Sequence, residues 1–101
     1  NGKLEVAKWL VEQARVDASA KRNDGQTPLH LAAWFGHLEV VKWLVDQARA
    51  DASARSNDGV TPLHEAAFNG HLEVAKWLVE QARVDASAKR NDGQTPLHLA
   101  A

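Results

Sequence analysis

The feature that most constrains this chain is a repeat of 34 residues. The tetrapeptide TPLH begins at Thr27, Thr61 and Thr95, so successive copies start 34 positions apart. Residues 1–34 match residues 35–68 at 24 positions. A repeat of this length is one supersecondary unit that cannot bury its apolar face alone, so neighbouring units must stack. The sequence therefore predicts a short solenoid with one continuous core.

Each unit starts with a turn and a short helix. The pair DG before QTPLH is a turn signal, because Gly takes a positive φ without strain and Asp bonds its own backbone. Thr27 is typical of a helix N-cap, and Pro28 is typical of the first helical position. We expect a helix from Pro28 to about Trp34, ended by Gly36.

A second helix follows Gly36 directly. Glu39 lies in its first turn, where the helix dipole favours an anion. Val40 and Trp43 widen its apolar stripe, so the helix must be covered on more than one side. The stripe itself has the helical spacing of three and four, at Leu38, Val41, Leu44, Val45 and Ala48. The polar run RADASARSNDG comes next, so each unit should be two antiparallel helices and a protruding loop.

The segment DGQTPLHLAAWFGHLEVVKWLVDQARADASA, from Asp24 to Ala54, resembles the ankyrin repeat. TPLH and GHLEV at a fixed spacing carry the resemblance, which covers the whole chain. It implies an all-α solenoid of stacked antiparallel helix pairs with protruding, β-hairpin-like loops, here called fingers. It also implies a concave face, recognition of a protein partner by the finger tips and the first helices, and no catalysis.

This alignment predicts two full repeats, over 23–56 and 57–90, between two partial ones. Residues 1–22 should hold a second helix (Leu4 to about Ala14) and a finger, and residues 91–101 a finger and a first helix. The chain is therefore expected to be a piece of a longer array. Its two ends should be complementary, and such a head-to-tail contact forms open filaments unless it closes.

The sequence departs from the family where the second helix ends. The usual period is 33, and the Gly expected there is replaced by Arg15, Arg49 and Arg83. A left-handed residue is favourable for Gly but costs an L-residue about 1–2 kcal/mol. We predict that the extra residue lets the helix continue through Gln13 and Ala14, and that the arginines avoid a positive φ.

Residues that recur with the period are assigned to architecture. The TPLH histidines could suggest a metal column, but stacked units hold them about 10 Å apart, whereas zinc ligands lie about 2 Å from the ion. We expect them to bridge backbone and Thr hydroxyls. The tryptophans could suggest aromatic recognition or base stacking, but their place in the apolar stripe favours packing. The set is Thr27, Pro28, His30, Thr61, Pro62, His64, Thr95, Pro96, His98, Trp9, Trp43 and Trp77.

Other residues are candidates for contact with a partner. Trp34 and Phe35 lie beyond TPLHLAA, at the end of the first helix, and exposed aromatic residues are enriched at interfaces. Partial burial between units is the alternative for them, and a solvated surface is the alternative for the charged fingers. The candidates are Lys21, Arg22, Gln26, Trp34, Phe35, Arg55, Ser56, Val60, Phe68, Asn69, Lys89, Arg90 and Gln94.

Composition narrows the functions further. The net charge is −1 and the basic residues are interleaved with acidic ones, which argues against a nucleic-acid partner. No apolar run reaches the roughly 20 residues of a membrane helix. No nucleophile triad, phosphate loop or HExxH motif occurs, so we predict no catalysis, cofactor or metal. The absence of cysteine leaves the redox compartment open, and we favour the cytoplasm.

Two functions remain. We favour a non-catalytic scaffold that binds a protein partner. The alternative is an engineered or structural self-stacking scaffold with no natural partner. Residues 1–33 and 69–101 favour the alternative, because they differ only at Lys3 and His71. Neither end shows the polar capping unit that solenoids normally carry.

Overall fold

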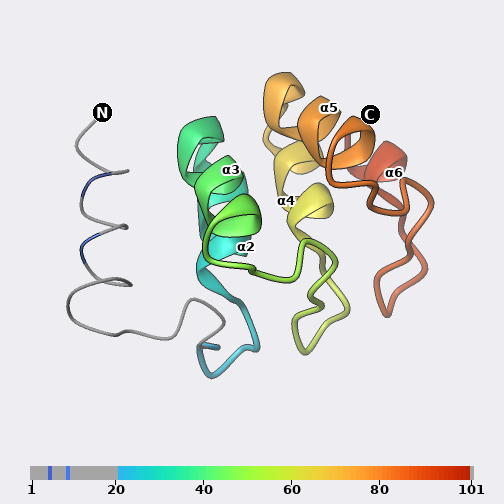
Figure 1. Ribbon diagram of the computed structural model, residues 1–101. Coiled ribbons are helices and arrows are strands. Elements are labelled where there is room, and N and C mark those ends of the chain that lie inside the picture. Colours follow the sequence, from blue (N-terminus) through green and yellow to red (C-terminus); the bar gives the residue numbers. More distant parts are fainter. Residues whose placement is uncertain (1–4, 6–8, 10–20, 101) are drawn as a thin grey trace.

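The computed structural model describes residues 5, 9 and 21–100. Residues 21–100 form helices and no strand: α2 (Pro28–Phe35), α3 (Leu38–Asp46), α4 (Pro62–Phe68), α5 (Leu72–Glu80) and α6 (Pro96–Ala100). Figure 1 shows the pairs α2–α3 and α4–α5 side by side, with α6 continuing the row. The helix expected from Leu4 to about Ala14 lies outside the described residues. None of the helices described is long and apolar enough to cross a membrane.

The first helices begin where TPLH supplies a cap. The Thr27 hydroxyl accepts the His30 backbone N–H at 3.4 Å, and the His30 ring accepts the Thr27 N–H at 3.1 Å. Thr61 and His64 make the same reciprocal pair at α4. Both donors would otherwise have no helical partner. α2 ends at Gly36, whose φ of 72° is left-handed and favours glycine.

The second helices end earlier than the sequence predicts. α3 ends at Asp46 and α5 at Glu80, so the expected extension is absent from both. Arg49 and Arg83 each have a φ of 59°, in the left-handed region. The prediction that these arginines avoid a positive φ is therefore wrong. Gln13, Ala14 and Arg15, for which it was first made, lie outside the described residues.

A wide turn after the helix absorbs the extra residue of the period. The Ala48 N–H donates to the Trp43 carbonyl at 3.1 Å, five residues back, and the Ala50 N–H donates to the Leu44 carbonyl at 2.8 Å, six residues back. α5 ends with the same pair of bonds. Arg49 lies inside this turn, and its left-handed backbone allows the chain to bend back far enough for Ala50 to reach the helix end.

The first helices stack directly on one another. α4 packs between α2 and α6, and each of α2 and α4 also packs on the second helix of its own pair. α3 and α5 are in contact as well. In Figure 1, α2, α4 and α6 follow one another along the row, so the described first helices form one continuous stack.

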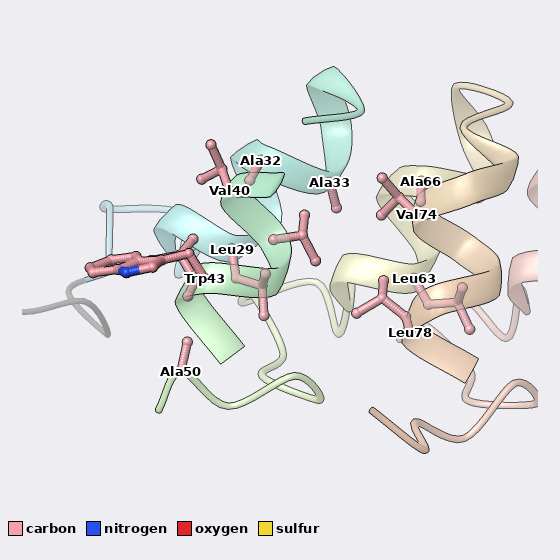
Figure 2. Packing of buried hydrophobic residues seen from close by; sticks show 12 residues of the cluster. Leu29, Ala32, Ala33, Val40, Trp43, Ala50, Leu63, Ala66, Val74 and Leu78 are labelled. Carbon is pink, nitrogen blue, oxygen red and sulfur yellow. The ribbon is translucent and has the colours of Figure 1, made fainter. Parts of the chain in front are cut away.

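The core between the helices is built from small and branched apolar side chains, shown in Figure 2. Ala33 and Ala66 are fully buried, and their lack of a Cγ lets the stacked helices approach closely. The larger buried side chains come from both members of each pair: Leu29, Val41 and Leu44 from α2 and α3, and Leu63, Val74 and Leu78 from α4 and α5.

The fingers are the loops before α2, α4 and α6, described over 21–27, 47–61 and 81–95. Each tip closes with a backbone bond across the turn, such as the Arg22 N–H to the Gln26 carbonyl at 2.8 Å. This closure is hairpin-like, although no strand forms in the described fingers. Gly25 has a φ of 83°, and a Cβ there would lie 2.6 Å from Asn57 Oδ1 of the next finger. Glycine is therefore required at this tip for two reasons, the positive φ and the lack of room for a Cβ next to Asn57.

Candidate functional site

The TPLH histidines join one unit to the next. The His30 Nδ1 accepts the Thr27 N–H, so its proton is on Nε2, which donates to the Val60 carbonyl at 2.7 Å. His64 repeats this with the Gln94 carbonyl at 3.2 Å. Burial lowers the pKa of both imidazoles, so they stay neutral at neutral pH. Among the residues that the structure describes, no group of three or more His, Cys, Asp or Glu could hold a metal ion.

The last TPLH copy keeps the local bonds but is less covered. The Thr95 N–H donates to His98 Nδ1 at 3.1 Å, as in the earlier units, yet His98 is exposed. Pro62 and Pro96 are buried at the starts of α4 and α6, and Pro28 is half-buried at the start of α2.

The three repeated tryptophans differ in burial. Trp43 is buried in the core cluster, and Trp77 is half-buried against it. Trp9 is 58% exposed, so the expectation that it is packed fails. Figure 2 shows Trp43 pointing away from α4 and α5. α5, which carries Trp77, is in contact with α3.

Aromatic side chains gather at the ends of α2 and α4. Trp34 and Phe68, which are equivalent positions of neighbouring units, stack with ring centroids 5.7 Å apart and an interplanar angle of 23°. Phe35 and Phe68 are 61% and 57% exposed, and Trp34 is 38% exposed. Phe35 also stacks on the His37 ring, with centroids 6.0 Å apart. These residues form an aromatic patch (Trp34, Phe35 and Phe68) on the surface.

The backbone beneath this patch is fixed by the next unit. The Trp34 carbonyl accepts hydrogen bonds from His71 Nε2 at 2.9 Å and from Asn69 Nδ2 at 3.1 Å. Asn69, a candidate for partner contact, is exposed, and its amide bonds the carbonyl near the end of α2. A Cβ on Gly36 would lie 2.6 Å from the His71 ring. The close fit holds Trp34 and Phe68 in position.

Two finger arginines, Arg22 and Arg90, are held by their own fingers. Arg22 donates to both carboxylate oxygens of Asp24, at 2.5 and 3.3 Å, and Arg90 pairs with Asp92 in the same way. These guanidinium bonds, with a backbone N–H two residues on, lower the pKa of each Asp to about 2. Arg55 reaches the next finger and donates to the Lys89 carbonyl at 2.6 Å.

The other finger candidates differ in exposure. Lys21, Lys89 and Gln94 are exposed, while Ser56 is half-buried and its hydroxyl accepts the Val60 N–H at 3.2 Å. Val60 is only 7% exposed, and its carbonyl accepts the hydrogen bond from His30 of the preceding unit. Its side chain is therefore not available to a partner, which corrects the expectation from its position in the repeat.

A pocket of about 490 Å³ opens between the first finger, α2 and α4. One carboxylate, Glu65, lies in it and is only 8% exposed. Gln26, from the finger before, donates to Glu65 Oε1 at 3.5 Å. Burial raises the pKa of Glu65. The lining residues are Arg22, Gln26, Leu31, Trp34, Phe35 and Glu65.

Comparison with known families agrees with this stack of helix pairs. The profile described as "Ankyrin repeats (many copies)" matches residues 1–45 and 37–79. The chain belongs to the ankyrin repeat family. Ankyrin repeats are generally non-enzymatic and act as modules of protein–protein interaction. A search among curated proteins finds no match to the chain.

Sequence reasoning missed two features of this ankyrin surface. Asn57 Nδ2 donates to the Asn23 carbonyl at 3.0 Å, and Asn91 Nδ2 donates to the Asn57 carbonyl at 2.9 Å, so asparagines tie the fingers together. The signal was the recurring NDG at every finger tip. The second feature is Glu65, which interrupts TPLHLAA as TPLHEAA. The signal for Glu65 was its charge, because the equivalent positions of the other units hold leucine.

Proposed function

We propose that this ankyrin array binds a protein partner on its finger tips and on the concave face of its first helices. The aromatic patch carries the proposal, because three large rings from two units remain at least partly exposed at the surface. Rigid aromatic side chains supply much of the binding energy at protein interfaces. The pocket beside the patch adds a concave feature between the same units.

The finger tips support the same assignment. Lys21 and Lys89 are exposed, and the ion pairs Arg22–Asp24 and Arg90–Asp92 hold their charged groups in fixed places on the first and third described fingers. Backbone and asparagine bonds between fingers hold these tips in register. A surface ordered in advance loses less entropy when a partner binds.

Selection of binding peptides from a random library would test this proposal. We expect the affinity of selected peptides to fall roughly tenfold or more in Phe35→Ala and Phe68→Ala variants, while thermal unfolding changes little, because both side chains are exposed. Val79→Ala on α5 is the matched control, an exposed apolar residue outside the patch. Equal affinity in all three variants would place the binding surface elsewhere.

Self-assembly is a second candidate. Leu97 of α6 is 79% exposed, whereas the equivalent Leu29 and Leu63 are buried by neighbouring helices. An apolar face of this kind can take another chain head-to-tail. Light scattering over a range of concentrations would decide, since a molecular mass that stays monomeric at high concentration would rule self-assembly out.

A further inference from the structure

Glu65 is an unusual residue for its place in the fold. α4 packs between α2 and α6, and the equivalent positions in those helices are Leu31 and Leu99. A buried carboxylate is costly unless it is paired or hydrogen-bonded. The raised pKa of Glu65 reflects this cost, since burial disfavours the ionised form.

The described residues satisfy this carboxylate only in part. The Gln26 amide donates to one oxygen at 3.5 Å, the outer limit of a hydrogen bond. A carboxylate can accept about four hydrogen bonds. Arg22 and Arg90 are close enough to influence Glu65, but each guanidinium is bound to the Asp two residues on. Neither forms an ion pair with Glu65, so its acceptor capacity faces the pocket.

The walls of the pocket are mostly apolar. Leu31, Trp34 and Phe35 line it beside Glu65, and the Trp34 ring is held by its stack on Phe68. The positive charge of Arg22 at the rim is balanced by Asp24, so an anion would gain little there and would be repelled by Glu65. An apolar wall next to one buried carboxylate suits a side chain with an aliphatic stem and a cationic head.

We propose that this pocket takes an arginine side chain of the protein partner, with its guanidinium donating to Glu65 and packing against Trp34. A guanidinium is planar, donates two parallel bonds to a carboxylate and stacks on indole rings, whereas an ammonium group does neither as well. This inference rests on the proposed function, because it names the anchor that the partner supplies to the same face.

Selected peptides can test the arginine directly. Random peptides would be selected on the wild-type chain and on the Glu65→Leu variant, and arginine should be enriched only on the wild type. Glu65→Leu should fold, because α2 and α6 already carry Leu at this position. Thermal unfolding of the variant would establish this before the selection.

A matched pair of peptides then isolates the charge. Replacing the peptide's arginine by citrulline, its neutral isostere, should weaken binding to the wild type roughly tenfold or more. Glu73→Gln, at an exposed glutamate of α5, is the control variant, and replacing arginine by citrulline should weaken binding to it as much as to the wild type. For Glu65→Gln, the same replacement should not weaken binding. Equal citrulline losses for Glu65→Gln and the wild type would overturn the proposal, as would enrichment of lysine in place of arginine.

The two proposals can fail separately. Peptides that need Phe35 and Phe68 but show no arginine preference would contradict the pocket assignment and leave the binding face in place. Peptides whose affinity is unchanged by Phe35→Ala and Phe68→Ala would contradict both proposals. A selection without binders would count against both as well.

Discussion

Arg49 and Arg83 show how a single residue accommodates the longer repeat. Their left-handed backbone costs about 1–2 kcal/mol for an L-residue. The wide turn closed by the Ala50 N–H requires that conformation at the position before Ala50. The side chain of Arg49 is exposed, so burial of the guanidinium group does not offset the backbone strain.

Arg49→Gly should therefore raise the free energy of unfolding by about 0.5–1 kcal/mol. Relief of the left-handed strain is offset in part by the larger freedom of Gly in the unfolded chain. Urea denaturation would measure the change. Arg49→Ala is the control, because it removes the guanidinium but keeps the strain, and it should be nearly neutral. Equal stabilisation by both substitutions would contradict the backbone explanation.

His30 and His64 make stability depend on pH. Burial lowers their folded-state pKa below the ordinary 6.5, so below about pH 6.5 the unfolded chain binds protons that the folded chain does not. Their stabilising contribution is therefore complete above pH 6.5 and is lost as the pH falls toward the folded pKa. The free energy of unfolding should drop by up to about 1.4 kcal/mol per pH unit for each histidine.

Urea denaturation at pH 7, 6 and 5 would measure this slope. Asp24 and Asp92 act in a separate window, since their pKa of about 2 matters only below the ordinary value of 3.8. His64→Gln should reduce the slope, because one titrating group is removed. A stability that stays constant from pH 7 to 5 would contradict the assignment of neutral, buried imidazoles.

The helices and fingers combine local signals with contacts to the next unit. TPLH caps each first helix with bonds between residues three apart, and the Gly at each finger tip allows the turn. The alignment of one finger with the next depends instead on Asn57 and Asn91, which reach carbonyl groups 34 residues away. These bonds are exposed, but they repeat along the row.

Asn57→Ala should lower the free energy of unfolding by about 1 kcal/mol. The substitution removes the side-chain bond to the Asn23 carbonyl while the backbone bond to Asp24 remains. Chemical denaturation would measure the loss. Asn69→Ala is a useful comparison, because it removes a bond between units at the other end of α4. An unchanged stability in Asn57→Ala would show that the fingers are aligned by the backbone alone.

At the scale of the whole molecule, the described helices form a row in which each helix pair contacts its neighbours, so stability should differ along the row. α4 is covered by α2 and α6, but α6 packs on α4 and leaves Leu97 mostly exposed. Local opening is easiest where few apolar contacts must break.

Amide hydrogen exchange should therefore be fastest in α6 and slowest in α4. Mass spectrometry of deuterium-labelled peptides would measure the exchange rates of α4 and α6. α2, which is also a first helix with the TPLH motif, would serve as an internal reference. Raising the protein concentration tests self-assembly in the same experiment, because a second chain covering Leu97 would slow exchange in α6. Uniform exchange over α2, α4 and α6 would contradict a row that opens from its less covered end.

The sequence alone determined the repeat, the helix pairs, the caps and the ankyrin family. These features follow from the repeat period and from hydrogen bonds between residues a few positions apart. Such local signals do not depend on which unit lies next in the stack. Three features were decided only by the tertiary structure: the burial of Val60, the left-handed backbone of Arg49 and the partly satisfied carboxylate of Glu65. In each case the outcome depends on the neighbouring unit or on a turn closed over several residues. Nearly identical sequences can therefore have different environments, because their neighbours in the stack differ.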